Sequence, residues 1–90
     1  MIVYISGSIS AASYKEKFQE ARLYLESLGH IVLDPSLLPS NMPAKNYTPI
    51  RLAMLEQSEA IYMLSDFRDN ELSMMELEYA SHQNKKIIFE

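Results

Sequence analysis

The sequence predicts a small α/β fold, a flavodoxin-like or Rossmann-like arrangement of three layers with a four-stranded parallel sheet and about three helices. Three observations lead to this prediction. Four short, largely apolar runs have the length and composition of buried strands. Helical patterns or helix-start signals lie between them, and this alternation is typical of parallel sheets with crossover helices. The 90 residues suffice for a single domain, 1–90, and not for two.

The first third of the chain predicts a strand, a helix and a second strand. Residues 2–5 form the first apolar run. Ser13 followed by Glu16 is the pattern of a capping box at a helix start, and Gly29 supplies the stop. Residues 31–33 then form a second buried strand. The helix between the two strands has apolar residues at helical spacing, namely Tyr14, Phe18, Ala21, Leu25 and Leu28.

The remainder of the chain begins with a predicted loop over residues 35–47, which holds three prolines and two asparagines. Loops of this length in compact domains are often functional. Thr48 and Pro49 form a good cap and first turn for a helix over 50–57. The remaining predicted elements are a strand at 60–64, a helix that Asn70 caps and that runs to about residue 83, and a strand at 86–89. We expect all four strands to be buried on both faces.

Composition excludes several classes of function. The chain has no cysteine, so disulfides, zinc–thiolate sites and thiol nucleophiles are absent. The net charge is −4 and the basic residues are scattered, which argues against binding of duplex nucleic acid. The apolar runs fall far short of the roughly 20 residues of a membrane span, and the first residues do not form a signal peptide. We therefore expect a cytoplasmic protein without a membrane partner, a cofactor or a metal ion.

Ligands of open α/β sheets bind beyond the carboxyl ends of the strands. The segment after the first strand is Ser6-Gly7-Ser8-Ile9-Ser10, in which Gly7 permits a tight turn. Free amides and hydroxyls of such a segment can hold a phosphate or a sugar, although a plain serine-rich turn has the same composition. The segment is neither a phosphate-binding P-loop nor a dinucleotide fingerprint, because the further glycines and the lysine of those motifs are missing.

Two residues outside that segment are candidates for chemistry. Glu76 borders the apolar face of the last helix, and its side chain leans toward the helix N-terminus, which lies at the carboxyl edge of the sheet. A half-buried carboxylate there is a candidate nucleophile or base, and the alternative is a boundary glutamate with its head in water. Tyr4, near the end of the first strand, either serves as a core aromatic or points its hydroxyl into the site.

The acidic segment 66–71 follows the third strand and has the residue types of a divalent-metal site. Its spacing is not that of a calcium loop, and acids before a helix are favoured by the helix dipole alone. His30 and His82 have no partner at metal-ligand or catalytic spacing. We therefore expect no metal at this segment.

Four stretches occur in an order that resembles the nucleoside 2-deoxyribosyltransferase-like family, which includes the deoxynucleoside 5′-monophosphate N-glycosidases and a small bacterial and phage branch. They are Tyr4-Ile5-Ser6-Gly7-Ser8-Ile9, Gly29-His30 followed by Asp34-Pro35, residues 52–62, and Glu76-Leu77-Glu78-Tyr79-Ala80. The resemblance covers essentially the whole chain.

The resemblance implies cleavage or transfer at an N-glycosidic bond. Glu76 would be the nucleophile that attacks the anomeric carbon of a ribose or deoxyribose, which is chemistry that a carboxylate can perform. Tyr4 would orient that carboxylate, and Asp69 matches an acidic residue that precedes the final helix. Gly7, Ser8 and Ile9 would line the sugar or phosphate pocket, and we include Ser6 and Ser10 with them.

The chain departs from the family pattern at two positions. Arg51 stands where the family has an aspartate that acts as general acid or holds the sugar. Arginine stays protonated, so it cannot act as that acid, but it could bind a phosphate. Leu72 stands where a glycine is expected and would crowd a ligand that approaches closely. Both departures weaken the case for catalysis more than the case for binding.

Three functions follow from these observations. The first is an N-glycosidase or deoxyribosyltransferase that acts on a nucleoside or nucleotide, with Glu76 as nucleophile. The second is a catalytically impaired protein that binds or sequesters a nucleotide, and the third is an interaction protein that uses the fold as a scaffold. An exposed sheet edge and apolar helix faces favour self-association, so we expect a homodimer or higher oligomer in which a neighbour helps to close the pocket.

Overall fold

The computed structural model describes residues 1–9 and 13–90, and it confirms the α/β fold with a parallel sheet of four strands. The strand order is β2-β1-β3-β4, and every neighbouring pair is parallel. The elements in chain order are β1 (Ile2–Ser6), α1 (Tyr14–Ser27), β2 (Ile31–Leu33), the 3₁₀ turn η1 (Pro35–Leu37), α2 (Ala44–Glu56), β3 (Ala60–Met63), the 3₁₀ turn η2 (Phe67–Asp69), α3 (Glu71–His82) and β4 (Lys86–Phe89).

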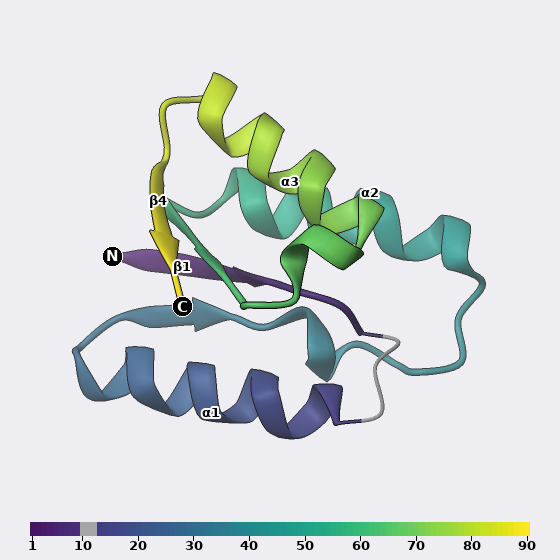
Figure 1. The fold of residues 1–90 in the computed structure, drawn as a ribbon, viewed down its shortest axis with the longest axis horizontal. Helices are drawn as coiled ribbons and strands as arrows, with labels where there is room; N and C mark the ends of the chain where they lie inside the picture. Colours follow the sequence, from purple (N-terminus) through teal and green to yellow (C-terminus); the bar gives the residue numbers. More distant parts are fainter. Residues whose placement is uncertain (10–12) are drawn as a thin grey trace.

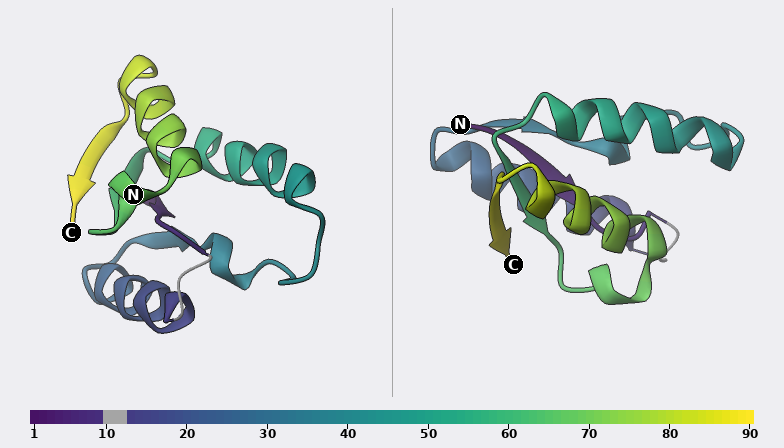
Figure 2. Two further views of the ribbon diagram at one scale, coloured as in Figure 1. Left: turned by 45° about the vertical axis from the view of Figure 1, so that its right-hand side comes forward. Right: turned by 90° about the horizontal axis from the view of Figure 1, so that it is seen from above.

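The helices lie on both faces of the sheet and complete three layers. Helix α1 covers one face, and α2 and α3 cover the other (Figures 1 and 2). Successive strand residues point to opposite faces, so β1 sends Val3 and Ile5 toward α1 and Tyr4 toward α2 and α3. The sheet therefore separates two apolar cores. None of the described helices has the length and apolarity that crossing a bilayer requires.

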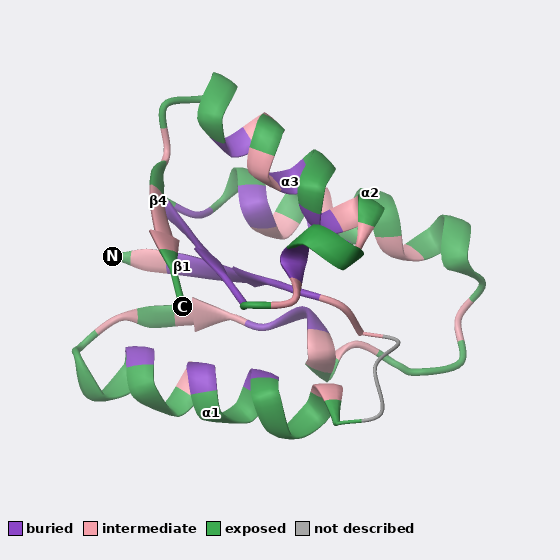
Figure 3. Ribbon diagram, viewed as in Figure 1, coloured by how far each residue is buried: buried purple, intermediate pink, exposed green. Residues whose placement is uncertain are grey.

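Burial differs between the central strands and the edge strands, and the prediction of four fully buried strands is wrong for the edges. Strands β1 and β3 lie in the middle of the sheet and are almost entirely buried (Figure 3). Strands β2 and β4 are half-buried, and the side chain of Ile31 is 65% exposed. An apolar run in the sequence indicates a strand but not whether the strand lies in the middle or at the edge of the sheet. An edge strand is less buried because it has a neighbouring strand on one side alone.

The start of α1 corrects a second prediction. Ser13 is the N-cap, but its side chain makes no capping hydrogen bond, so the capping box with Glu16 is wrong. The backbone of Ser13 has φ −111° and ψ 28°, away from the extended conformation from which a cap side chain reaches the first free amides. The end of α1 agrees with the prediction, because Gly29 adopts a φ of +89°.

The start of α2 corrects a third prediction. The helix begins at Ala44 after Pro43, so residues 44–47 are helical and Pro49 lies inside the helix. Tyr47 accounts for this early start: its hydroxyl donates to the Pro39 carbonyl and accepts from the Met42 amide, which ties the first turns to the preceding loop. The cap and first turn expected at Thr48 and Pro49 are therefore wrong.

Helix α3 begins as predicted. Asn70 is its N-cap, and the side-chain oxygen accepts a hydrogen bond of 2.9 Å from the Ser73 amide. Because all strands are parallel, their carboxyl ends meet at one edge of the sheet, and the N-termini of α2 and α3 lie toward that edge. Residues from β1, α2 and α3 can therefore converge there.

Candidate functional site

A buried polar cluster joins three elements on the face of the sheet that α2 and α3 cover. Tyr4 and Ser6 are two residues apart on β1, so their side chains share that face. Arg51 comes from α2 and Glu76 from α3. Among these four residues, Tyr4, Ser6 and Arg51 are essentially inaccessible, and Glu76 is 3% exposed.

Glu76 is the acceptor at the centre of the cluster. Its Oε1 accepts from the Ser6 hydroxyl at 2.6 Å and from Nη2 of Arg51 at 2.9 Å. Its Oε2 accepts from the Tyr4 hydroxyl at 2.7 Å and from Nε of Arg51 at 3.1 Å. Each carboxylate oxygen thus has two donors, which is the number of lone pairs that it presents.

Arg51 grips the carboxylate with two nitrogens, the fork geometry that arginine favours with carboxylates. Its Nε also donates to the Tyr4 hydroxyl at 2.8 Å, and its Nη2 lies 3.5 Å from the Gly7 carbonyl oxygen. The side chain is 1% exposed. The structure therefore places Arg51 against Glu76, whereas the sequence suggested that it faces a phosphate.

The cluster perturbs two of its members. Burial raises the pKa of Tyr4 well above its usual range, and the negative charge of Glu76 raises it further, while Arg51 opposes both. Burial alone would lower the pKa of Arg51, but Tyr4 and Glu76 outweigh it and raise that pKa above its usual value. Tyr4 is thus held as a neutral donor and Arg51 as a cation.

The sequence predicts that Glu76 is half-buried, and the structure buries it more deeply, so the alternative of a boundary glutamate with its head in water is wrong. Its helix position correctly indicated the apolar face. The sequence did not reveal the bidentate partner, because Arg51 and Glu76 are 25 residues apart on different helices.

The segment after β1 packs closely against Leu64, the residue that follows β3. A Cβ added at Gly7 would lie 2.6 Å from Cδ1 and 2.9 Å from Cβ of Leu64, so this position needs glycine for space. The Ser8 amide donates to Oδ1 of Asp66 at 3.3 Å, and Ile9 packs against the core under α1. Ser10, predicted to contact a ligand, lies outside the described residues.

Asp69, the third residue with a predicted catalytic role, does not join the cluster. It lies in η2 with an exposed side chain and makes no hydrogen bond to Tyr4, Arg51 or Glu76. Within residues 1–9 and 13–90, no group of three or more histidine, aspartate or glutamate side chains is arranged to hold a metal ion.

A recess of about 270 Å³ lies beyond the carboxyl ends of β1 and β2. Ile9, Tyr14 and Tyr47 line it together with the loop that follows η1. Tyr47 and Arg51 are four residues apart on α2, so the recess lies about one helical turn from the buried cluster. The sequence does not single out either tyrosine for a site, because Tyr47 falls in a predicted loop and Tyr14 on the apolar face of the first predicted helix.

A second recess, of about 380 Å³, shares Ser36, Leu38 and Ser40 with the first. Lys15 and Arg22 line it, and Arg22 forms an ion pair of 2.5 Å with the buried Asp34. The two neighbouring hollows thus combine an aromatic lining with a cationic one. Leu72 lies elsewhere: with Glu76 it lines a separate apolar cavity of about 150 Å³ between α2 and α3.

Comparison with known proteins identifies a family for this chain. A family model described as "Domain of unknown function (DUF4406)" matches residues 1–89. No curated protein and no solved structure matches the chain significantly.

Proposed function

We propose that this chain, which belongs to the DUF4406 family of domains of unknown function, binds a nucleoside or nucleotide at the carboxyl edge of its sheet without cleaving it. The observation that carries this proposal is that the Glu76 carboxylate is buried and fully hydrogen-bonded. A nucleophilic carboxylate needs an oxygen that can reach the substrate, but both oxygens of Glu76 are occupied by donors in a buried cluster.

The two recesses beyond β1 and β2 supply the groups that a nucleotide would contact. Aromatic rings such as those of Tyr14 and Tyr47 are surfaces on which a base can stack. Lys15 lines the neighbouring recess and can pair with a phosphate, whereas Arg22 is already engaged by Asp34. The ligand class comes from the resemblance of the chain to nucleoside 2-deoxyribosyltransferase-like proteins, and the linings are compatible with it.

Calorimetry with a panel of nucleosides and their 5′-monophosphates tests the proposal, together with chromatography for released base. We expect binding without base release. Tyr47→Ala should weaken binding of nucleosides and nucleotides alike, whereas Lys15→Ala should weaken binding of the monophosphates alone. Tyr24→Ala, at an exposed tyrosine of α1 away from both recesses, is the matched control and should bind like the parent. Failure of every nucleoside and nucleotide to bind would overturn the proposal.

A second candidate is N-glycosidic cleavage or transfer with Glu76 as nucleophile. The hydroxyls of Tyr4 and Ser6, one on each carboxylate oxygen, favour it because they orient the group. Arg51 would have to withdraw so that one oxygen could bond to the anomeric carbon, while the base leaves with the electron pair of the N-glycosidic bond and is protonated. Water or a second base would then release the sugar from Glu76. Base release by the parent that Glu76→Gln abolishes, while circular dichroism shows that the variant is still folded, would establish this candidate in place of the first.

A further inference from the structure

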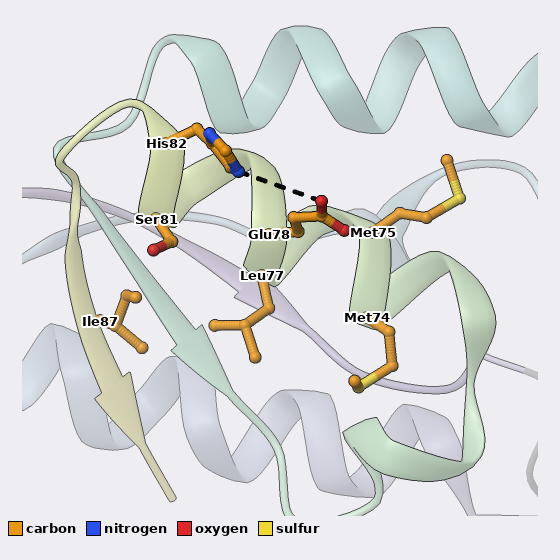
Figure 4. Close-up of a pocket in the computed structure, with 7 residues that line it drawn as sticks. All are labelled: Met74, Met75, Leu77, Glu78, Ser81, His82 and Ile87. Carbon is orange, nitrogen blue, oxygen red and sulfur yellow. Dashed lines mark ion pairs between the residues drawn. The ribbon is translucent and has the colours of Figure 1, made fainter.

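Strand β4 forms an open edge of the sheet next to an apolar groove. The groove has a volume of about 490 Å³ and lies between the outer side of α3 and β4. Its apolar lining comes from Met74, Met75, Leu77 and Ile87 (Figure 4). Phe89, at the end of β4, is 56% exposed. Within residues 1–9 and 13–90, no strand pairs with the outer edge of β4.

The backbone of β4 shows which of its residues can accept a further strand. The amides of Lys86 and Glu90 donate to the carbonyls of Glu59 and Met63 at 3.1 and 2.9 Å, so these two residues direct their hydrogen bonds toward β3. Backbone groups alternate in direction along a strand, so Ile87 and Phe89 direct their N–H and C=O groups toward the open edge.

We propose that β4 pairs antiparallel with β4 of a second copy, about a twofold axis at Ile88, and so joins two sheets into one of eight strands. Residues with outward-facing backbone groups must pair with one another in such a ladder. With the axis at Ile88, Ile87 pairs with the partner subunit's Phe89 and Phe89 with the partner subunit's Ile87, which gives two hydrogen-bonded pairs. An axis at Ile87 or at Phe89 leaves one such pair within the strand.

The charges of β4 fit the same register. Lys86 begins the strand and Glu90 follows it, and both side chains are exposed. Oε1 of Glu90 accepts a hydrogen bond of 2.7 Å from the Ser65 amide of the same chain, so the partner's lysine would approach the other carboxylate oxygen. With the axis at Ile88, Lys86 lies opposite the partner subunit's Glu90, and the twofold axis repeats the contact. A lysine at an edge usually discourages pairing, but here the antiparallel register places an acid against it.

The apolar groups of the two copies also meet in this register. Ile87 packs on the core under α3, and the Phe89 ring lies 5.6 Å from that of Phe67, so both residues face the side of the sheet that carries the groove. Opposite residues of an antiparallel pair point to the same face. The partner subunit's Phe89 therefore lies beside Ile87, at the mouth of the groove, and its exposed ring becomes covered.

Light scattering of the full chain over the micromolar range tests this interface. The pairing involves two short strands, so we expect a dimer whose population rises with concentration. Lys86→Glu and Glu90→Lys should each yield a monomer at concentrations where the parent is dimeric, because each sets like charges opposite each other twice. An equimolar mixture of these two variants should recover the dimer, since both contacts then join opposite charges. Glu20→Lys, an exposed reversal on α1, is the control and should leave the dimer intact.

Ile88→Cys reports the register directly, because the chain has no other thiol. Residues at the axis form a non-hydrogen-bonded pair with Cα atoms about 4.5 Å apart, a separation that a disulfide spans. We expect rapid crosslinking of Ile88→Cys under mild oxidation and none for Leu23→Cys, at an exposed position of α1. A parent that stays monomeric, single charge variants that stay dimeric, or an Ile88→Cys dimer that does not crosslink would each overturn the proposal.

Discussion

Arg51 and Glu76 form a buried, bidentate ion pair between α2 and α3, with Nη2 and Oε1 2.9 Å apart. The pair joins two helices across the face of the sheet, and its carboxylate accepts hydrogen bonds from the hydroxyls of two residues of β1. It links the fold to the proposed function, because it both fastens three elements together and occupies the carboxylate that a glycosidase of this kind would use.

Breaking the pair from one side should destabilise the fold strongly. Arg51→Met leaves a buried carboxylate without its cation, and Glu76→Gln leaves a buried guanidinium without its anion, so each should lower the free energy of unfolding by about 3–5 kcal/mol. The double variant leaves neither charge unpaired and should lose much less than the sum. Urea denaturation measures all three. Glu78→Gln, on the exposed side of α3, is the control, and additive losses would contradict the coupling.

The raised pKa of Tyr4 predicts a pH dependence of stability. An unfolded tyrosine releases its proton near pH 10, whereas folded Tyr4 keeps its proton to a higher pH. The contribution of Tyr4 to stability is therefore fully present below about pH 10 and is lost as the pH rises above that value. Above about pH 10 the folded state holds one proton more than the unfolded state, so the free energy of unfolding falls by about 1.4 kcal/mol for each unit of rising pH. Tyr4→Phe should remove this component and make the alkaline decline shallower, as measured by urea denaturation between about pH 9 and 11. An unchanged slope would show that Tyr4 does not contribute.

The two glycines should respond to alanine for different reasons. Gly7→Ala places a methyl group within 3 Å of the Leu64 side chain, and Leu64 must shift, so we expect a loss of about 1–3 kcal/mol. Gly29→Ala meets no atom within 4 Å, but φ at this position is +89°, so the loss of about 1 kcal/mol comes from backbone strain. Leu64→Val should partly rescue Gly7→Ala and leave Gly29→Ala unaffected. Thermal unfolding distinguishes the two cases.

Pro49 should be a site of easy stabilisation. It lies inside α2, where it has no amide to donate to the Lys45 carbonyl, and its side chain is exposed. Pro49→Ala restores that hydrogen bond and so stabilises the folded state. Alanine also gives the unfolded chain more conformational entropy, which offsets part of the gain, and we expect a net increase of about 1–2 kcal/mol in the free energy of unfolding. Pro43→Ala, before the first helical residue, is the control and should not stabilise. Urea denaturation measures both, and a loss of stability in Pro49→Ala would contradict the expectation.

Local patterns were sufficient to predict most of the fold. Apolar runs located all four strands, Gly29 marked the end of α1, and Asn70 marked the start of α3, because each of these signals acts through neighbouring backbone groups. Parallel strands followed from the alternation with helices, and with them the edge at which Tyr4 and Glu76 meet. The early start of α2 was missed, since Tyr47 fixes it through contacts with the preceding loop.

The sequence by itself determined which elements form, in what order, and which residues reach the carboxyl edge, because strand and helix periodicity are local properties. Tertiary structure alone decided that Arg51 neutralises Glu76, and that β4 presents an open edge. Both depend on which segments become neighbours across the sheet: Tyr4 lies 72 residues from Glu76 and Arg51 lies 25 residues from it. A charge in the sequence has no fixed environment until burial removes water and leaves one partner within reach.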